Sequence, residues 1–253
     1  MDSPNLYVPY QKAAVIPDVH QDTDFVFAVY DFIEKDGTFD GVIFLGDYFD
    51  YHKSQGPRAG VKATVGAILR DCPLPATYLL GNHDAQYLWT NRQRQIKAKQ
   101  AFEIPVGCSG YSKSRAVDVK RYWPEMGNRV QPFALCQGVL LSHAGINSRL
   151  ILPIYEDQEA LEKLYLAMTA DVKNVSVDHP LFWIPRSRGG HHPFGGPLWQ
   201  DWHEFEDDLP WPQVVGHTAN KRIPSMIGRS LCLDHGQTTW ATLEGGDLHI
   251  HKV

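Results

Sequence analysis

The sequence predicts an α/β protein with a parallel sheet, and observations in its first third carry this prediction. Short apolar runs at Ala13–Ile16, Val42–Leu45 and Thr77–Leu80 have the length and composition of buried strands. The segments between these runs place apolar residues at helical spacing, and polar side chains follow each run at once. This order of strand, helix, strand, helix and strand brings the polar groups to the carboxyl edge of a parallel sheet, where ligands bind in such folds.

Two helices connect the three predicted strands. The first is expected to begin at Asp22, because Phe25 and Val29 then recur at helical spacing and Gly37 can end the helix in a left-handed turn. The second helical stripe covers Val61–Leu69.

The middle of the chain departs from this regular order. Residues 85–130 are interpreted as an insertion, with an exposed polar helix over Gln86–Ala101 and a loop-rich part after it, where Pro105 and Pro124 stand among several glycines. Strand character returns over Phe133–Leu141.

The last third predicts one more helix and a series of short strands. Glu156–Ala170 carries apolar residues at helical spacing. Residues 175–212 are dense in Pro, Gly, His and Trp, and a loop of this length is usually functional, so we interpret it as lid-like. Short strands are expected at 230–233, 238–243 and 248–251, the last two joined at Gly245-Gly246.

Composition limits the class of protein. The 253 residues suit a single domain over 1–253, and 43% hydrophobic with 21% charged residues is typical of a globular chain. The net charge of −5 argues against a general nucleic-acid binder. The four cysteines form no C-x-x-C pair, and the chain shows neither a signal peptide nor an apolar run long enough to span a membrane. We expect a cytoplasmic protein.

Polar clusters follow five apolar runs directly. They are Asp18-Val19-His20, Gly46-Asp47-Tyr48-Phe49-Asp50, Gly81-Asn82-His83-Asp84, Ser142-His143-Ala144-Gly145 and Gly216-His217-Thr218. A single His beside a strand is more often a structural histidine than a ligand. Five such clusters at the ends of five strands are difficult to assign to chance, and they converge if the strands share one sandwich.

The converging side chains would form a metal site. They supply two carboxylates, three imidazoles and one amide, without a thiolate. Such donors suit Mn, Fe, Zn or Co better than Ca or an iron–sulfur cluster. One ion does not account for so many ligands, whereas two ions that share a carboxylate account for all of them. Two ions roughly 3.5–4 Å apart polarise a phosphoryl group and generate hydroxide at neutral pH.

The five clusters, in this order, resemble the sequence blocks of the calcineurin-like metallophosphoesterases. The resemblance covers residues 18–218 and favours the phosphoprotein-phosphatase branch, which includes bacterial and phage serine/threonine phosphatases and symmetrical diadenosine tetraphosphatases. Leu198-Trp199-Gln200-Asp201 and Leu233-Asp234-His235-Gly236 are similar to weaker blocks of that branch. The resemblance implies a four-layer αββα sandwich, in which two mixed β-sheets lie face to face with helices outside.

The resemblance also implies a role for each site residue. The two metal ions would be held by Asp18, His20, Asp47, Asn82, His143 and His217, with Asp47 bridging. Manganese is the ion expected in vitro, with Fe, Zn, Co or Ni as alternatives. A metal-bridging hydroxide would attack phosphorus, His83 would protonate the leaving oxygen, and Asp50 would orient His83 and keep it protonated. An imidazolium beside a carboxylate is a suitable general acid near neutral pH.

One departure from the family pattern concerns the grip on phosphate. Relatives commonly carry an arginine directly after the position of Asp50, where this chain has Tyr51-His52. A phenol or an imidazole does not replace a bidentate guanidinium. We expect Asn82 and an arginine from a loop to bind the substrate. The candidate arginines are Arg58 and Arg188, with Arg186 beside the latter.

Several functions remain open from the sequence. The first is hydrolysis of phosphomonoesters on a small molecule, a nucleotide or a phosphoprotein. The alternatives are a dinucleoside polyphosphate hydrolase, a phosphodiesterase or nuclease, and a non-catalytic binding module. A nuclease is disfavoured by the net acidity and because Gly216-His217 continues as Thr218-Ala219 rather than as Gly-His-x-His. A binding module is disfavoured because all seven expected ligand and acid positions are filled.

Two segments each allow two interpretations. The tryptophans of residues 175–212 are expected to serve packing, since buried aromatic rings carry much apolar area, although a lid that stacks a nucleobase is the alternative. The basic segment Arg92–Lys99 is expected to be a solvated helix face and could instead attract a polyanionic substrate.

Overall fold

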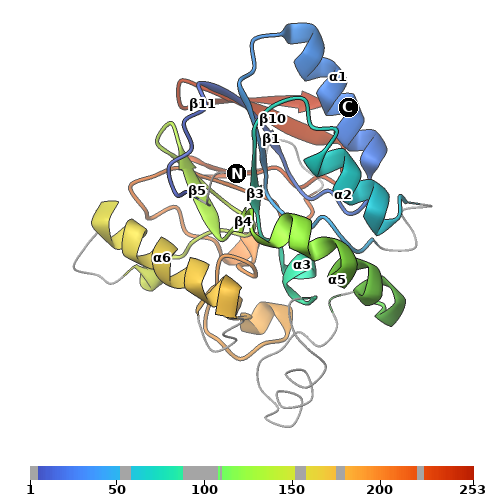
Figure 1. Ribbon diagram of the computed structural model, residues 1–253. Helices are drawn as coiled ribbons and strands as arrows, with labels where there is room; N and C mark the ends of the chain where they lie inside the picture. The colour runs from blue at the N-terminus through green and yellow to red at the C-terminus, as the bar shows by residue number, and fades with distance from the viewer. Residues whose placement is uncertain are drawn as a thin grey trace.

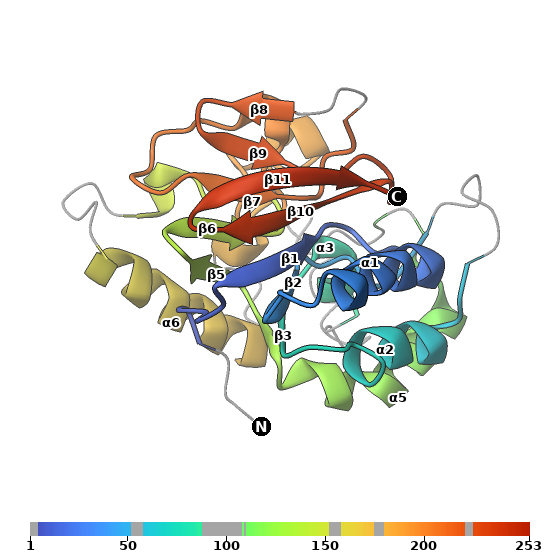
Figure 2. The same cartoon turned by 90° about the horizontal axis from the view of Figure 1, so that it is seen from above.

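The protein is a sandwich of two mixed β-sheets with helices on the outer faces (Figure 1 and Figure 2). The computed structural model describes residues 5–51, 58–87, 108, 110–151, 158–174, 180–220 and 225–253. This architecture confirms the predicted α/β class and the predicted pair of mixed sheets flanked by helices. Within the described residues, no helix combines the length and the apolar character that crossing a membrane requires.

The first sheet has the strand order β11-β10-β1-β2-β3-β4. Its strands are β1 (Lys12–Ile16), β2 (Gly41–Phe44), β3 (Ala76–Leu79), β4 (Val130–Gln131), β10 (Thr239–Glu244) and β11 (Asp247–Lys252). Strands β1 to β4 are parallel, whereas β10 runs antiparallel to β1 and to β11. The parallel arrangement of the first three strands confirms the sequence prediction.

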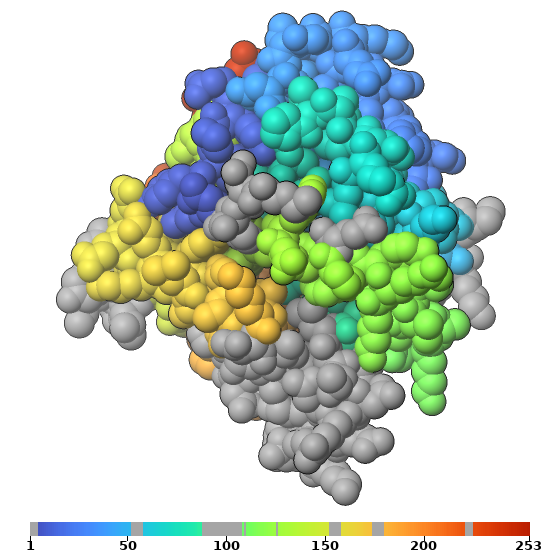
Figure 3. Space-filling model, in the orientation of Figure 1, coloured from blue at the N-terminus to red at the C-terminus, as the bar shows by residue number. Residues whose placement is uncertain are grey.

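Helices α1 (Thr23–Asp36) and α2 (Val61–Leu69) make the first two crossovers between the parallel strands. The Asp22 side chain accepts the Phe25 N–H at 3.1 Å, which caps the start of α1. Gly37 ends the helix in the left-handed conformation, at φ 68°. Both ends of this helix therefore lie where the sequence predicts them. Helices α1, α2 and α5 lie side by side over one face of the molecule (Figure 3).

Helix α5 (Lys113–Gly127) overturns the expectation of a loop-rich segment. Ser112 caps the helix by accepting the Arg115 N–H at 3.0 Å, and Pro124 stands inside it. The helix packs against α2 and makes the crossover from β3 to β4. Burial of Val119 and Met126 outweighs the cost of an internal proline.

Other expectations for residues 85–130 remain predictions. Gln86–Ala101, where an exposed helix is expected, falls mostly outside the described residues, as does all of Arg92–Lys99. Helix α3 (Asn82–Ala85) is a single turn that directly follows the end of β3.

The second sheet has the strand order β5-β6-β7-β9-β8. Its strands are β5 (Phe133–Cys136), β6 (Val139–Ser142), β7 (Gln213–Val215), β8 (Ser225–Ile227) and β9 (Ser230–Cys232). The expected single strand over Phe133–Leu141 is in fact the hairpin β5–β6, which turns at Gln137-Gly138 with φ angles of 52° and 78°. Two positive φ angles suit the tight turns of hairpins.

The alternation of strand side chains builds two separate apolar layers. Ala13 and Val15 of β1 face the second sheet, whereas Ala14 and Ile16 face the helices. On the far side, α6 (Gln158–Asn174) covers the second sheet, with the Tyr165 ring 5.5 Å from the Phe133 ring. Short 3₁₀ turns complete this outer layer. They are η2 (Ser148–Leu150), η3 (Pro180–Phe182), η4 (Arg186–Arg188) and η5 (Trp202–Glu204).

Two valines of α5 provide a matched test of this packing. Val119 is 1% exposed and Val117 is 68% exposed. We expect Val119→Ala to lower the free energy of unfolding by about 1–2 kcal/mol, because it leaves a cavity. Val117→Ala should change it by less than about 0.5 kcal/mol, since alanine is also the better helix former. Urea denaturation followed by circular dichroism measures both, and equal effects would show that α5 does not pack as described.

Candidate metal centre

The site forms where the strand ends of the two sheets meet. His143, just after β6, lies with its Nδ1 3.0 Å from the carbonyl oxygen of Leu45, just after β2. His217 lies just after β7, and Asp18 lies just after β1. The backbone N–H of His217 donates to Oδ1 of Asp18 at 2.9 Å. The two sheets therefore share one polar edge, and residues separated by up to 199 positions come into contact there.

Glycines in the predicted motifs permit this close approach. A Cβ atom on Gly81 would lie 2.2 Å from the backbone nitrogen of Asp47, and one on Gly216 would lie 2.1 Å from Oδ1 of Asp18. Neither position has room for a side chain. The glycine before each of these ligands is thus a packing requirement between neighbouring loops, which explains its place in the motif.

Several site residues adopt a backbone conformation that L-amino acids rarely populate. The φ angles are 45° for His20, 50° for Asp47, 62° for Asp50 and 66° for His217. Positive φ at residues other than glycine costs of order 1–3 kcal/mol each, and such residues concentrate at functional sites. The chain turns sharply after each strand, and this turn aims the side chain into the shared edge.

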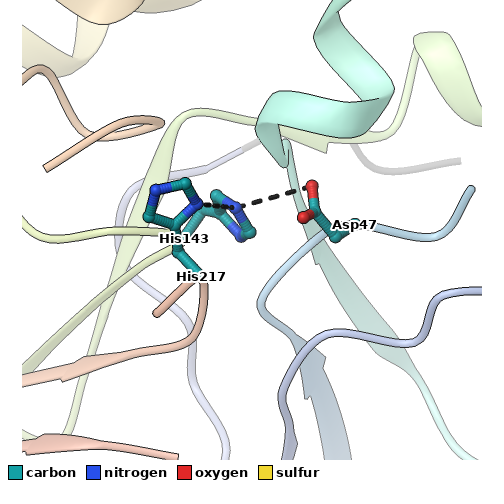
Figure 4. Close-up of side chains that lie close together, drawn as sticks. All are labelled: Asp47, His143 and His217. Carbon is teal, nitrogen blue, oxygen red and sulfur yellow. Dashed lines mark hydrogen bonds and ion pairs between the residues drawn. The ribbon is translucent and has the colours of Figure 1, made fainter. Parts of the chain in front are cut away.

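Two groups of potential ligands share Asp47. Asp18, His20 and Asp47 form one group, and Asp47, His143 and His217 form the other. Within each group the donor atoms all lie within 4.8 Å of one another. Figure 4 shows that His143 lies between His217 and Asp47. A single carboxylate common to both groups is the arrangement that two neighbouring cations require.

Asn82 joins the second group through its amide oxygen. Its Oδ1 lies 2.8 Å from Nε2 of His143 and 3.0 Å from Nδ1 of His217. The structure thus brings together all six predicted metal ligands, with Asn82 supplied by the first turn after β3. Their role as ligands stays a prediction.

The imidazoles are held in the neutral form that ligates metals. Burial lowers the pKa of His143 to about 3 and the pKa of His20 to about 4, and it also lowers the pKa of His217. Nδ1 of His20 lies 2.5 Å from the carbonyl oxygen of Asp50. A ring nitrogen that donates to a carbonyl leaves the other nitrogen free for a metal. Nε2 of His20 and of His143 face Asp47, and Nε2 of His217 is buried with no hydrogen-bond partner among the described residues.

The pKa values of the carboxylates shift in the opposite direction to those of the imidazoles. Burial raises the pKa of Asp18, and the charge of Asp234 adds to this effect. Burial, followed by the charge of Asp18, raises the pKa of Asp47. Among the described residues, the ion-pair partners of Asp18 and Asp47 are histidines, which are neutral here. Buried carboxylates need a counter-charge, and divalent cations at this position fit that need.

His83 and Asp50 lie beside the ligand groups. The backbone N–H of His83 donates to Oδ1 of Asp47 at 2.9 Å. The His83 ring packs edge-on against the His20 ring, with the centroids 5.2 Å apart. Nδ1 of His83 is buried, has no hydrogen-bond partner in the described part of the chain, and lies 3.5 Å from Oδ2 of Asp50. His83 is 15% exposed at its side chain, so a substrate can reach it, whereas Asp50 is fully buried.

Asp84 completes the third motif with a structural role. Its carboxylate accepts the N–H groups of Tyr48, Phe49 and Gly81 at 2.9, 3.2 and 3.0 Å. These three bonds tie the loop after β2 to the loop after β3. They fix Asp47 relative to Asn82, which follows Gly81 in the chain.

The two predicted substrate arginines lie in different places. Arg58 pairs with Asp22, the residue that caps α1. Arg188 lies next to the ligands: Nε is 2.7 Å from Oδ2 of Asp201, and NH2 donates to Oγ1 of Thr218 at 2.9 Å. The structure therefore favours Arg188 as the arginine near the metal ligands.

Sequence reasoning missed Arg115. It reaches Asp50 from α5 with NH1 2.5 Å from Oδ1, and its guanidinium lies 5.1 Å from the centre of the Tyr51 ring. No local motif marks this residue, since 65 positions separate it from its partner. A buried carboxylate in need of a cation is the one signal that could have prompted a search for it.

The tryptophans between residues 175 and 212 mainly pack. Trp199 and Trp202 are buried, and the Trp199 ring lies 5.8 Å from the His217 ring. Trp183 stacks on His192 with the centroids 4.5 Å apart. The buried pair fits the packing interpretation, while the lid stays a prediction.

Comparison with known proteins agrees with this geometry. A family model described as calcineurin-like phosphoesterase matches residues 12–221. The chain belongs to the calcineurin-like phosphoesterase family. This family typically binds two divalent metal ions, and the two Asp/His groups of this phosphoesterase fit such a pair.

Solved structures resemble this phosphoesterase in fold. A cold-active protein-tyrosine phosphatase from a Shewanella species is 18% identical, with a TM-score of 0.62 over 100% of this chain and 80% of that chain. A protein serine/threonine phosphatase from Saccharomyces cerevisiae is 13% identical, with a TM-score of 0.51 over 98% of this chain and 83% of that chain. Among curated proteins, none matches the chain.

Metal binding should stabilise the protein, because it supplies the missing counter-charge. With Mn²⁺ at about 100 times its Kd, we expect about 2.7 kcal/mol of stabilisation, or about 5–10 °C in Tm for a chain of this size. Asp47→Asn should abolish most of this shift without lowering the Tm of the metal-free protein, since a neutral amide needs no cation. Thermal unfolding in Mn²⁺ and in chelator measures both.

Asp31→Asn serves as the matched control, because Asp31 is exposed on α1. It removes one negative charge and should keep the full metal-dependent shift. A shift retained in Asp47→Asn would contradict the shared-ligand arrangement.

Proposed function

We propose that the protein is a two-metal phosphoesterase that hydrolyses phosphomonoesters. The observation that supports this most strongly is the sharing of buried Asp47 between two ligand groups, with His83 at their side. Such a site suits phosphoryl transfer, in which negative charge on the phosphoryl oxygens must be stabilised.

The metal ions would be held by the residues already described. Asp18, His20 and Asp47 would hold one, and Asp47, Asn82, His143 and His217 the other. When bound, the ions would polarise the phosphoryl group and lower the pKa of a water molecule. We propose Mn²⁺ as the ion that supports activity in vitro, because nitrogen and oxygen donors without a thiolate suit it.

His83 is the proposed general acid. The oxygen of water would form a new bond to phosphorus and release a proton to solvent, while the bond from phosphorus to the leaving oxygen breaks. The leaving oxygen would take a proton from Nε2 of His83, which then regains one from solvent. Asp50 orients the ring, since its Oδ2 faces Nδ1 of His83 at 3.5 Å. Hydrogen bonds of this kind are often long in a free enzyme and shorten when the substrate binds.

Arg188 is the proposed grip on the phosphate. A guanidinium carries five N–H donors, so its contacts to Asp201 and Thr218 leave donors for phosphate oxygens. The same contacts hold the side chain beside His217, since Thr218 is the next residue. Asn82 is the second proposed substrate contact, because its amide lies between the ligand histidines.

The first test is a panel of substrates in Mn²⁺. It contains phenyl phosphate, para-nitrophenyl phosphate, phosphopeptides, bis-para-nitrophenyl phosphate, a dinucleoside polyphosphate and DNA. We expect the monoesters to react fastest. His83→Ala should lower kcat on phenyl phosphate by about 10²–10⁴-fold, since a poor leaving group needs the proton. His249→Ala, on the exposed face of β11, should leave it unchanged.

Faster turnover of a diester or a dinucleoside polyphosphate would replace the proposed substrate class. Undiminished turnover of phenyl phosphate by His83→Ala would remove His83 from the proposed role.

The second test concerns Arg188. Arg188→Met should lower kcat/KM for phenyl phosphate by about 10–100-fold, the usual effect of losing a hydrogen bond to a charged group. The loss should fall mainly on KM, because the contact with phosphate exists before the reaction. Arg186→Met is the matched control, since Arg186 is an exposed arginine of the same 3₁₀ turn. Equal kinetics for the two variants would exclude Arg188 from the phosphate site.

A further inference from the structure

The carboxylate of Asp50 is enclosed by side chains from two segments, residues 83–87 and helix α5. Oδ1 accepts hydrogen bonds from NH1 of Arg115, at 2.5 Å, and from the Tyr87 hydroxyl. Oδ2 accepts from the Gln86 amide and faces Nδ1 of His83 at 3.5 Å. The carboxylate is fully buried, so these partners replace its contact with water.

Arg115 supplies the full positive charge in this enclosure. Tyr87 and Gln86 are neutral donors, and a buried carboxylate with neutral donors alone lacks a compensating charge. Burial acts to lower the pKa of Arg115, yet the hydrogen bond and the charge of Asp50 outweigh burial and raise it. The guanidinium is therefore a permanent cation beside Oδ1.

The Arg115 side chain is itself held in place. NH1 also donates to the carbonyl oxygen of Gly110 at 2.5 Å, and the guanidinium lies over the Tyr51 ring. Gly110 has φ 95°, and a Cβ atom there would meet Cβ of Asp50 at 3.0 Å. The loop before α5 thus packs directly on Asp50. With its side chain only 16% exposed, Arg115 has little freedom to leave this position.

The enclosure fixes which oxygen faces the proposed acid. Arg115 and Tyr87 occupy Oδ1, so Oδ2 is the oxygen left toward His83. Nδ1 of His83 is buried and has no hydrogen bond in the described structure. A separation of 3.5 Å lies just beyond a good hydrogen bond. A small rotation of the Asp50 carboxylate therefore decides whether His83 is oriented.

We propose that Arg115 is a positioning residue for proton transfer: it holds Asp50 so that Oδ2 orients the His83 ring toward the leaving oxygen. This inference depends on the proposed function, in which His83 is the acid. Arg115 acts through Asp50 and does not need to touch the substrate.

The test compares two esters that differ in their need for a proton. Phenoxide is a poor leaving group and needs protonation, whereas para-nitrophenoxide leaves readily without it. We expect Arg115→Met to lower kcat on phenyl phosphate by about 10–100-fold, part of the usual effect of a general acid. On para-nitrophenyl phosphate the loss should stay below about 3-fold, with KM unchanged for both, since the phosphate contacts are intact.

Two further variants separate positioning from a merely structural role. Arg115→Lys keeps the positive charge but lacks the planar guanidinium. Its kcat on phenyl phosphate should lie between those of wild type and Arg115→Met. Arg121→Met removes an exposed arginine from the same helix and should match wild type. If Arg115→Met does not fold, the ratio of the two esters in Arg115→Lys gives the same test.

The double variant is the strongest measurement. In a His83→Ala background, Arg115→Met should lower kcat by no more than about 2-fold, because residues that act as one unit are not additive. Equal losses on both esters, a rise in KM alone, or a full additional loss in the His83→Ala background would each overturn the proposal.

The outcomes also separate this proposal from the proposed function. If wild type hydrolyses neither ester, the proposed function itself fails. If His83→Ala is impaired while Arg115→Met behaves as Arg121→Met, only the role of Arg115 fails.

Discussion

The burial of Asp47 beside a second carboxylate governs the site. Its Oδ1 accepts a hydrogen bond from the backbone N–H of His83, and its Oδ2 faces His20. Burial raises the pKa of Asp47 most, and the charge of Asp18 raises it further. Effective desolvation of an ion in a protein interior costs several kcal/mol. The surrounding imidazoles are neutral and cannot offset that cost. Two cations could do so, and the neutral imidazoles would then serve as their ligands.

Neither sheet can form this site alone. The first sheet supplies Asp18, His20, Asp47 and Asn82, whereas the second supplies His143 and His217. The apolar layer between the sheets therefore sets the distances between these candidate ligands. Packing around the left-handed turns after the strands holds those turns in place. Strain of this kind persists only where surrounding structure over-determines it. The bonds from Asp84 to three backbone N–H groups are part of that structure.

Sequence reasoning worked where local patterns and tertiary demands agree. The first three strands, α1 with its caps, and the convergence of five strand-end clusters follow from apolar runs and from the side chains after them. It failed for α5, because Pro124 and the flanking glycines suggest loops while buried Val119 and Met126 decide the helix. It also merged β5 and β6, because apolar residues stand on both sides of Gln137-Gly138, although the chain turns at that pair.

Arg115 shows why the rest of the site could not be predicted. A metal ligand after a strand is fixed by the sheet edge, so its place in the sequence carries information. A counter-charge needs only to reach a buried carboxylate, and any helix that packs nearby can provide it. In this chain α5 is both the crossover that carries the backbone from β3 to β4 and the source of the guanidinium on Asp50. Because α5 packs against α2, the helix places Arg115 within reach of Asp50. Tyr51, which directly follows Asp50, packs its ring under the same guanidinium.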